Sequence, residues 1–175
     1  MPVVSAVSGV PPILLFGYGN PGCGDDALGP LLQEAMAAQD LPNIECLTDM
    51  QLQVEHITDL VGREYVLFID ADMSCTAPYV VEQLSPRQDS SYTSHAMSPA
   101  AVLHAFRQVY GVDAPPAYLL HIRGYAFELG DALTKQAAEN LAAALAWVQS
   151  WVETLPSQMP IHVSRSTPLP ALPPS

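Results

Sequence analysis

The chain has 175 residues, of which 49% are hydrophobic, and this suits one compact domain with a single core. Six Lys and Arg residues against 18 Asp and Glu residues give a formal net charge of −12 at pH 7. Because that field repels nucleic acid and anionic lipid, we expect neither a nucleic-acid nor a membrane partner. The same field favours a basic substrate or partner segment, although acidity is also common in soluble enzymes.

The cysteines and the apolar segments bear on where the protein works. Cys23, Cys46 and Cys75 form no C-x-x-C pair, so they indicate neither a disulfide framework nor a zinc site. No basic region precedes the first apolar segment, and no apolar run approaches the length of a membrane span. We therefore expect a soluble, cytoplasmic protein. We also expect it to be a monomer.

The first predicted element in chain order is a buried strand at Ile13–Tyr18, which follows an N-terminal arm at residues 1–12. A glycine-rich turn comes next, and apolar residues then recur at helical spacing over residues 28–36. Asp25 or Asp26 would cap this helix, because a carboxylate there accepts from free backbone N–H groups and favours the positive end of the helix dipole.

The remaining predicted elements alternate between strand and helix. They are strands at 44–47, 65–69, 79–84 and 117–122, and helices at 52–61, 99–110 and 134–155. The connection before 79–84 is too short for a parallel crossover, so we expect that strand to run antiparallel to the strand at 65–69. Six prolines after residue 155 predict a disordered tail at 156–175.

This alternation indicates a three-layer α/β/α sandwich over residues 13–155, with a mixed, mostly parallel sheet of five strands, one of them antiparallel. Such sheets bind ligands beyond the carboxyl ends of their strands. The candidate ligands follow two predicted strands or precede a helix: Asp25, Asp26, Asp70, Asp72 and His95. Carboxylates with an imidazole suit a divalent ion that keeps an open position. Helix caps, turn formers and an exposed loop histidine are the plainer interpretations.

A nucleotide site is a further alternative. Gly17, Gly19 and Gly22 match G-x-G-x-x-G between a strand and a helix, as in Rossmann-type dinucleotide-binding proteins. Asp25 and Asp26, however, put negative charge where a pyrophosphate would meet the helix N-terminus. No acidic residue clearly ends the second strand to hold a ribose, so this alternative is the less favoured one.

Three motifs together resemble the [NiFe]-hydrogenase maturation endopeptidases. They are F-G-Y-G-N-P-x-x-x-D-D-x-x-G at Phe16–Gly29, I-D-A at Ile69–Ala71 and S-H-A-M-S-P-A-A-V-L at Ser94–Leu103. H-I-R-G-Y at His121–Tyr125 is also similar to the family. The resemblance implies a five-stranded sheet with one antiparallel strand. It also implies a protease that removes the C-terminal extension of a hydrogenase large-subunit precursor once nickel has been inserted.

The resemblance also assigns roles to single residues. The metal-recognising side chains of the family correspond to Asp26, Asp70 and His95, and the nickel would come with the substrate rather than be permanently bound. Relatives carry Glu where this chain has Asp26, which is one methylene shorter. Asp25 is assigned to capping or to support of the ligands. The other supporting residues are Gly17, Gly19, Asn20 and Gly29. A non-catalytic chaperone that checks nickel in the large subunit is the alternative function.

Overall fold

The computed structural model describes residues 9–87 and 96–155. The described strands are β1 (Ile13–Tyr18), β2 (Ile44–Asp49), β3 (Tyr65–Asp72), β4 (Tyr79–Gln83) and β5 (Ala117–Arg123). The helices are α1 (Leu28–Ala37), α2 (Pro99–Tyr110) and α3 (Lys135–Thr154), with the short 3-10 helices η2 (Gly24–Ala27) and η3 (Val54–Leu60). The strands form one sheet in the order β2-β1-β3-β5-β4. All neighbouring pairs are parallel except β4 with β5.

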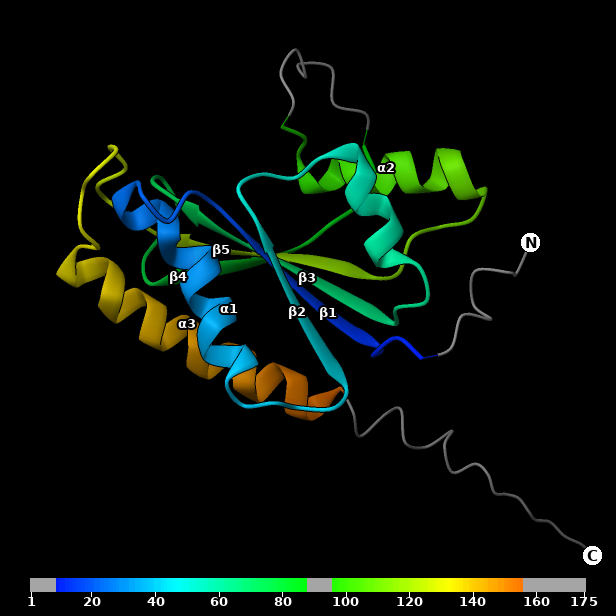
Figure 1. Ribbon diagram of the computed structural model, residues 1–175, viewed down its shortest axis with the longest axis horizontal. Helices are drawn as coiled ribbons and strands as arrows, with labels where there is room; N and C mark the ends of the chain where they lie inside the picture. Colours follow the sequence, from blue (N-terminus) through cyan, green and yellow to red (C-terminus); the bar gives the residue numbers. More distant parts are fainter. Residues whose placement is uncertain (1–8, 88–95, 156–175) are drawn as a thin grey trace, which may run out of the picture.

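The sheet lies between two helical layers (Figure 1), with α1 and α3 on one face and α2 and η3 on the other. Successive residues of β1 explain why both faces are covered. Ile13 and Leu15 pack on the α1–α3 side, whereas Leu14 and Phe16 pack on the α2–η3 side, and all four are buried. A strand buried on both faces must be apolar throughout, as this one is. The predicted α/β/α sandwich is confirmed.

Two elements differ from the sequence expectation. Residues predicted as a second helix form the 3-10 helix η3, and the side chain of His56 takes part in the capping of its first turn. Its Nδ1 accepts from Gln53 N at 2.8 Å, and its Nε2 lies 3.0 Å from Asp49 Oδ2, which ties η3 to the end of β2. The strand predicted at 65–69 continues to Asp72, because its last residues pair with β5.

The antiparallel strand β4 runs in the predicted direction, but its neighbour is β5. Val80 and Asp70 are both register partners of His121, from opposite sides, so β5 separates β4 from β3. The short β3–β4 connection therefore spans one intervening strand. As a result, His121 comes between side chains of two strands that lie far earlier in the sequence.

The order of the strands fixes where a ligand can reach the sheet. From β1 the chain moves to β2 on one side, and it then returns to β3 on the other side of β1. Connections that leave β1 and β3 in opposite directions open a crevice at their carboxyl ends. Asp26 follows β1 and Asp70 lies near the end of β3, so both belong to this edge of the sheet.

Candidate functional site

The turn after β1 is shaped by close backbone contacts. A Cβ atom added to Gly17 would lie 2.6 Å from Gly29 O, so the backbones of β1 and α1 touch at this point. A Cβ atom on Gly19, which has a φ of +148°, would lie 2.1 Å from Asp26 O. The turn therefore folds back on itself, and Asn20 N donates to Asp26 Oδ2 at 2.7 Å. This bond holds the Asp26 carboxylate beside the end of β1.

Asp70 faces that carboxylate from the neighbouring strand. Gly17 and Ile69 are register partners in β1 and β3, so Tyr18 and Asp70 come next to each other, and the Tyr18 hydroxyl forms a hydrogen bond with the Asp70 side chain. Burial, together with the negative charge of Asp26, raises the pKa of Asp70 to about 7. Burial and the Asp70 charge in turn raise the pKa of Tyr18. The carboxylates of Asp26 and Asp70 thus repel each other in a partly buried crevice.

Asp25, for which the resemblance left capping or support open, does not cap the helix. The helix-capping expectation is wrong for both Asp25 and Asp26, since the N-cap residue of α1 is Ala27, with no side-chain cap, and η2 occupies the intervening turn. The Asp25 side chain is fully buried. Its Oδ2 accepts from Tyr125 N, Ala126 N and Thr134 Oγ1, and its Oδ1 accepts from Thr134 N.

These bonds explain how a carboxylate is kept charged in the interior. Burial alone would raise the pKa of Asp25, but the hydrogen bonds from Thr134, Tyr125 and Ala126 outweigh it and lower the pKa below its usual value. The carboxylate therefore fastens the β5–α3 connection to the turn that carries Asp26. Asp25 supports the edge of the sheet instead of facing the crevice.

His95 lies outside the described residues. The chain resumes at Ala96, and Met97 N donates to Leu52 O at 3.0 Å, which places this segment beside the connection that follows β2. Ser98 then caps α2 by accepting from Ala101 N, as its position before Pro99 predicts. Within residues 9–87 and 96–155, no three His, Cys, Asp or Glu side chains form a group that could hold a metal ion.

A further polar cluster lies at this edge, around His121, which the sequence placed only in the motif at His121–Tyr125. Its Nδ1 lies 3.0 Å from Asp72 Oδ2 and its Nε2 lies 2.9 Å from Glu82 Oε1, so β5 is joined to β3 and β4. Burial would raise the pKa of Asp72, but hydrogen bonds from Ser74 and the charge of His121 lower it. Asp72 was already a candidate in the sequence, but no local pattern predicts that it meets His121 and Glu82, because the three residues come together only through the order of the strands.

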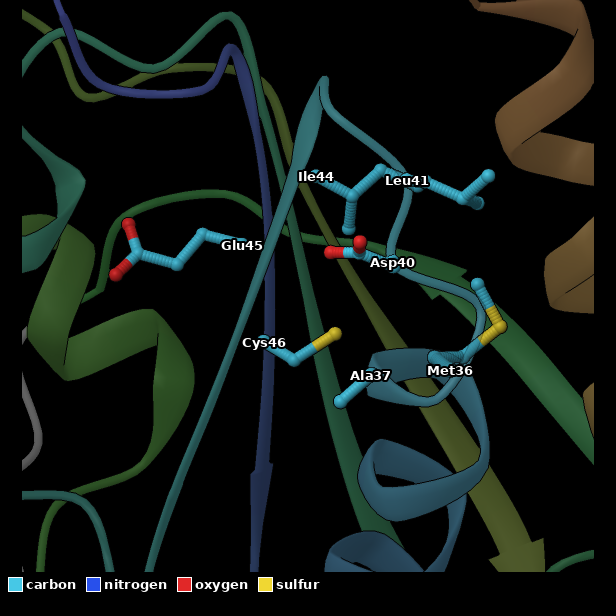
Figure 2. Close-up of a pocket in the computed structure, with 7 residues that line it drawn as sticks. All are labelled: Met36, Ala37, Asp40, Leu41, Ile44, Glu45 and Cys46. Carbon is cyan, nitrogen blue, oxygen red and sulfur yellow. The ribbon is translucent and has the colours of Figure 1, made fainter.

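The opposite edge of the sheet has a pocket of about 220 Å³ between the end of α1 and the start of β2. Figure 2 shows the Cys46 thiol pointing toward Ala37, while Glu45 points to the other side of β2. Burial and the Glu45 charge raise the pKa of Cys46 to about 11, so the thiol stays protonated. No cluster of reactive side chains lines this pocket. Among the described residues, the interacting polar side chains lie at the carboxyl edge of the sheet.

Comparison with known proteins identifies the fold. No family model matches the chain, and no curated protein matches it. Among solved structures, the [NiFe] hydrogenase maturation protease HycI from Thermococcus kodakarensis KOD1 has a TM-score of 0.64 at 16% identity, covering 85% of this chain and 96% of its own. The hydrogenase maturating endopeptidase HybD from E. coli has a TM-score of 0.63 at 23% identity, covering 81% of this chain and 92% of its own.

A hydrogenase 2 maturation peptidase from Thaumarchaeota archaeon SCGC_AB-539-E09 has a TM-score of 0.57 at 22% identity, covering 80% of this chain and 97% of its own. This protein is therefore an α/β protein with the fold of the hydrogenase maturation proteases. The fold agrees with the resemblance carried by the three sequence motifs. None of the helices in the described part of the chain is long and apolar enough to cross a membrane.

Proposed function

We propose that this protein is a cytoplasmic, monomeric hydrogenase maturation endopeptidase, with its activity in one domain at residues 13–155. It would remove the C-terminal extension of a [NiFe]-hydrogenase large-subunit precursor after nickel insertion. One observation carries the proposal: Asp26 and Asp70, which belong to two of the family motifs, interact across the carboxyl edge of the sheet in a chain with this protease fold.

The electrostatics of this pair favour a cation. Burial and the Asp26 charge make an ionised Asp70 unfavourable, and a divalent ion between the two carboxylates would relieve that repulsion. Carboxylate oxygens also suit a divalent ion, and the imidazole of His95 would add a borderline donor. In this proposal Asp26, Asp70 and His95 bind the nickel that the precursor carries. Tyr18 fixes the orientation of Asp70 through its hydroxyl.

This arrangement would make cleavage conditional on nickel. The substrate-borne ion would hold the scissile segment against the edge of the sheet and polarise its carbonyl or activate a water molecule. A precursor without nickel would lack the group that Asp26 and Asp70 bind, so it would stay uncut. Asp25 contributes indirectly, because its buried bonds to the β5–α3 connection keep the turn of Asp26 in place.

The test is precursor trimming with and without nickel, followed by mass spectrometry of the released C-terminal peptide. Asp26→Asn, Asp70→Asn and His95→Gln should each slow trimming by about a hundredfold or more, the scale typical of lost ligand positioning. Asp113→Asn changes an exposed carboxylate paired with Arg107 and is the matched control. Full activity in all three variants would contradict the assignment. Stoichiometric binding of the precursor by the wild type, without cleavage, would indicate a nickel-checking chaperone.

A further inference from the structure

Exposed apolar side chains gather around the carboxyl edge of the sheet. Five of the seven large apolar side chains exposed in residues 9–87 and 96–155 lie in connections that follow β2, β3 and β5. We call these five residues the apolar rim: Met50, Val54, Met73, Tyr125 and Leu129. Single exposed apolar residues are ordinary, whereas several in the connections at one edge of a sheet, beside a polar site, fit an interaction surface.

The most exposed member of the rim stands on a firmly held loop. Leu129 is 82% exposed and belongs to the β5–α3 connection, which is drawn in yellow in Figure 1. Gly130 N donates to Gly22 O at 2.8 Å, and Glu128 N donates to Asp131 Oδ2 at 2.9 Å on the other side of Leu129. The buried Asp25 holds both ends of this connection. A leucine displayed on a loop fixed in this way loses little conformational entropy on binding.

Tyr125 is held in a similar way. Its hydroxyl accepts from Asn140 Nδ2 at 3.1 Å, and the Arg123 guanidinium lies 4.8 Å from the centroid of its ring. The residue as a whole is nevertheless 41% exposed. Tyrosine and methionine are enriched at the centres of protein–protein interfaces, because they give large contact areas to a partner. The rim thus combines fixed anchors with adaptable methionines.

The charges around the rim narrow the choice of partner. The same edge of the sheet carries acidic residues: Asp26 after β1, Asp49 and Asp72 at the ends of β2 and β3, and Glu128 and Asp131 in the β5–α3 connection. Arg123 is the basic residue at the end of β5, and it is already engaged with Cys75 O at 3.0 Å. A second copy of this chain would bring the same acidic edge and a further net charge of −12, so self-association through the rim is opposed. An apolar polypeptide segment flanked by basic side chains complements this surface.

We propose that the apolar rim is the docking surface for the protein substrate, which it binds through an apolar segment flanked by Lys or Arg residues. This inference rests on the proposed endopeptidase function. The rim surrounds the edge at which Asp26 and Asp70 face each other, so docking there would present the scissile segment to both carboxylates. Recognition of the substrate protein would then be separate from recognition of its metal.

The test compares the kinetics of trimming of the nickel-loaded, full-length precursor in matched surface variants. Met73→Ser and Leu129→Ser remove two exposed rim side chains that make no internal hydrogen bond through their side chains, and Val109→Ser is the control. Val109 is 62% exposed, as is Met73, but it lies at the end of α2, away from the carboxyl edge. All three variants should melt at the wild-type temperature, since each side chain is largely outside the core.

The expected result is a change in KM rather than in kcat. The Met73→Ser/Leu129→Ser double variant should raise KM about tenfold with kcat unchanged, because lost docking is lost uniform binding. Added salt should raise KM for the wild type, because the docking charges are exposed and are screened. Val109→Ser should behave as wild type.

Three outcomes would contradict the proposal that the rim is a docking surface. In the first, the KM of the double variant stays within about twofold of the wild-type value, which is a small change on the scale of lost interface contacts. This result would exclude the rim as the docking surface and leave the proposed function standing. A wild-type dimer, measured by light scattering, that dissociates in the double variant would assign the rim to self-association. Wild-type protein that cleaves no hydrogenase precursor would overturn the proposed function itself, and the docking inference with it.

Discussion

The buried carboxylate of Asp25 is bound at both oxygens by Thr134, which lies 109 residues further along the chain. Thr134 N donates to Oδ1 and Thr134 Oγ1 donates to Oδ2, each at 2.8 Å. Thr134 Oγ1 also caps α3 by accepting from Ala137 N at 3.1 Å. The turn after β1 and the start of the last helix are thereby joined through one charged side chain.

Replacing Asp25 should therefore damage the fold as well as the site. Asp25→Ala removes a buried acceptor and leaves the N–H groups of Tyr125, Ala126 and Thr134 without a partner, which should lower the free energy of unfolding by about 3 kcal/mol or more. Urea denaturation followed by circular dichroism measures this change. Asp113→Asn, at an exposed carboxylate, should stay within about 0.5 kcal/mol of the wild type. Equal stability of the Asp25 and Asp113 variants would refute the role given to Asp25.

The pH dependence of stability should contain an acid-side contribution from Asp25. Its pKa is lower in the folded protein than in the unfolded chain, so its stabilisation is complete above the unfolded value of about 3.9 and is lost as pH falls through the folded pKa. Asp25→Asn should accordingly flatten the fall in melting temperature between about pH 5 and about pH 2. An unchanged slope in the variant would contradict the lowered pKa.

Asp70 should contribute to the pH dependence of stability with the opposite sign to Asp25. Its pKa is raised to about 7 in the folded protein, so the folded state binds more protons than the unfolded state between about pH 4 and about pH 7. Stability from this residue is present at low pH and is lost as pH rises through that window. Asp70→Asn should therefore gain stability over the wild type at pH 8 but not at pH 4, which melting curves at the two pH values can measure.

The repulsion between the Asp26 and Asp70 carboxylates can be tested separately. Because the Asp26 charge is, after burial, the next largest cause of the raised Asp70 pKa, Asp26→Asn should lower that pKa. Titration of the Asp70 side chain by carbon-detected NMR follows this shift directly. An unchanged Asp70 titration in Asp26→Asn would show that the two side chains do not interact.

The contact between β1 and α1 can be tested with matched glycine variants. Gly17→Ala puts a Cβ atom 2.6 Å from Gly29 O and from the Gln33 side chain, so α1 must move away from the sheet. We expect a loss of about 1–3 kcal/mol, as for other overpacked interiors. Gly111→Ala meets no atom within 4 Å and has only the strain of its φ of +76°, so it should lose about 1 kcal/mol. A smaller effect at Gly17 than at Gly111 would argue against the close approach.

Much of the fold follows from local patterns. The apolar run at Ile13–Tyr18 forms β1 with the predicted bounds, and Ser98 before Pro99 begins α2 as a capping residue should. The direction of β4 followed from the length of the connection before it. The helix expected at residues 52–61 is the 3-10 helix η3 at Val54–Leu60, and side-chain bonds of His56 to Gln53 and Asp49, which no local pattern predicts, tie it to the end of β2.

In the candidate site, too, some features follow from local sequence and others depend on tertiary contacts. The motif around the glycine turn and the acid at the end of β3 were visible in the sequence, because turn chemistry and strand ends are properties of adjacent residues. The bonds of Asp25 to Thr134, and of His121 to Asp72 and Glu82, were not visible. These pairs are set by the order of the strands and by the closure of long loops. Residues far apart in the chain meet only when the whole sheet has assembled, and for that reason only the tertiary structure decided which distant groups the carboxylates of Asp25 and Asp72 bind.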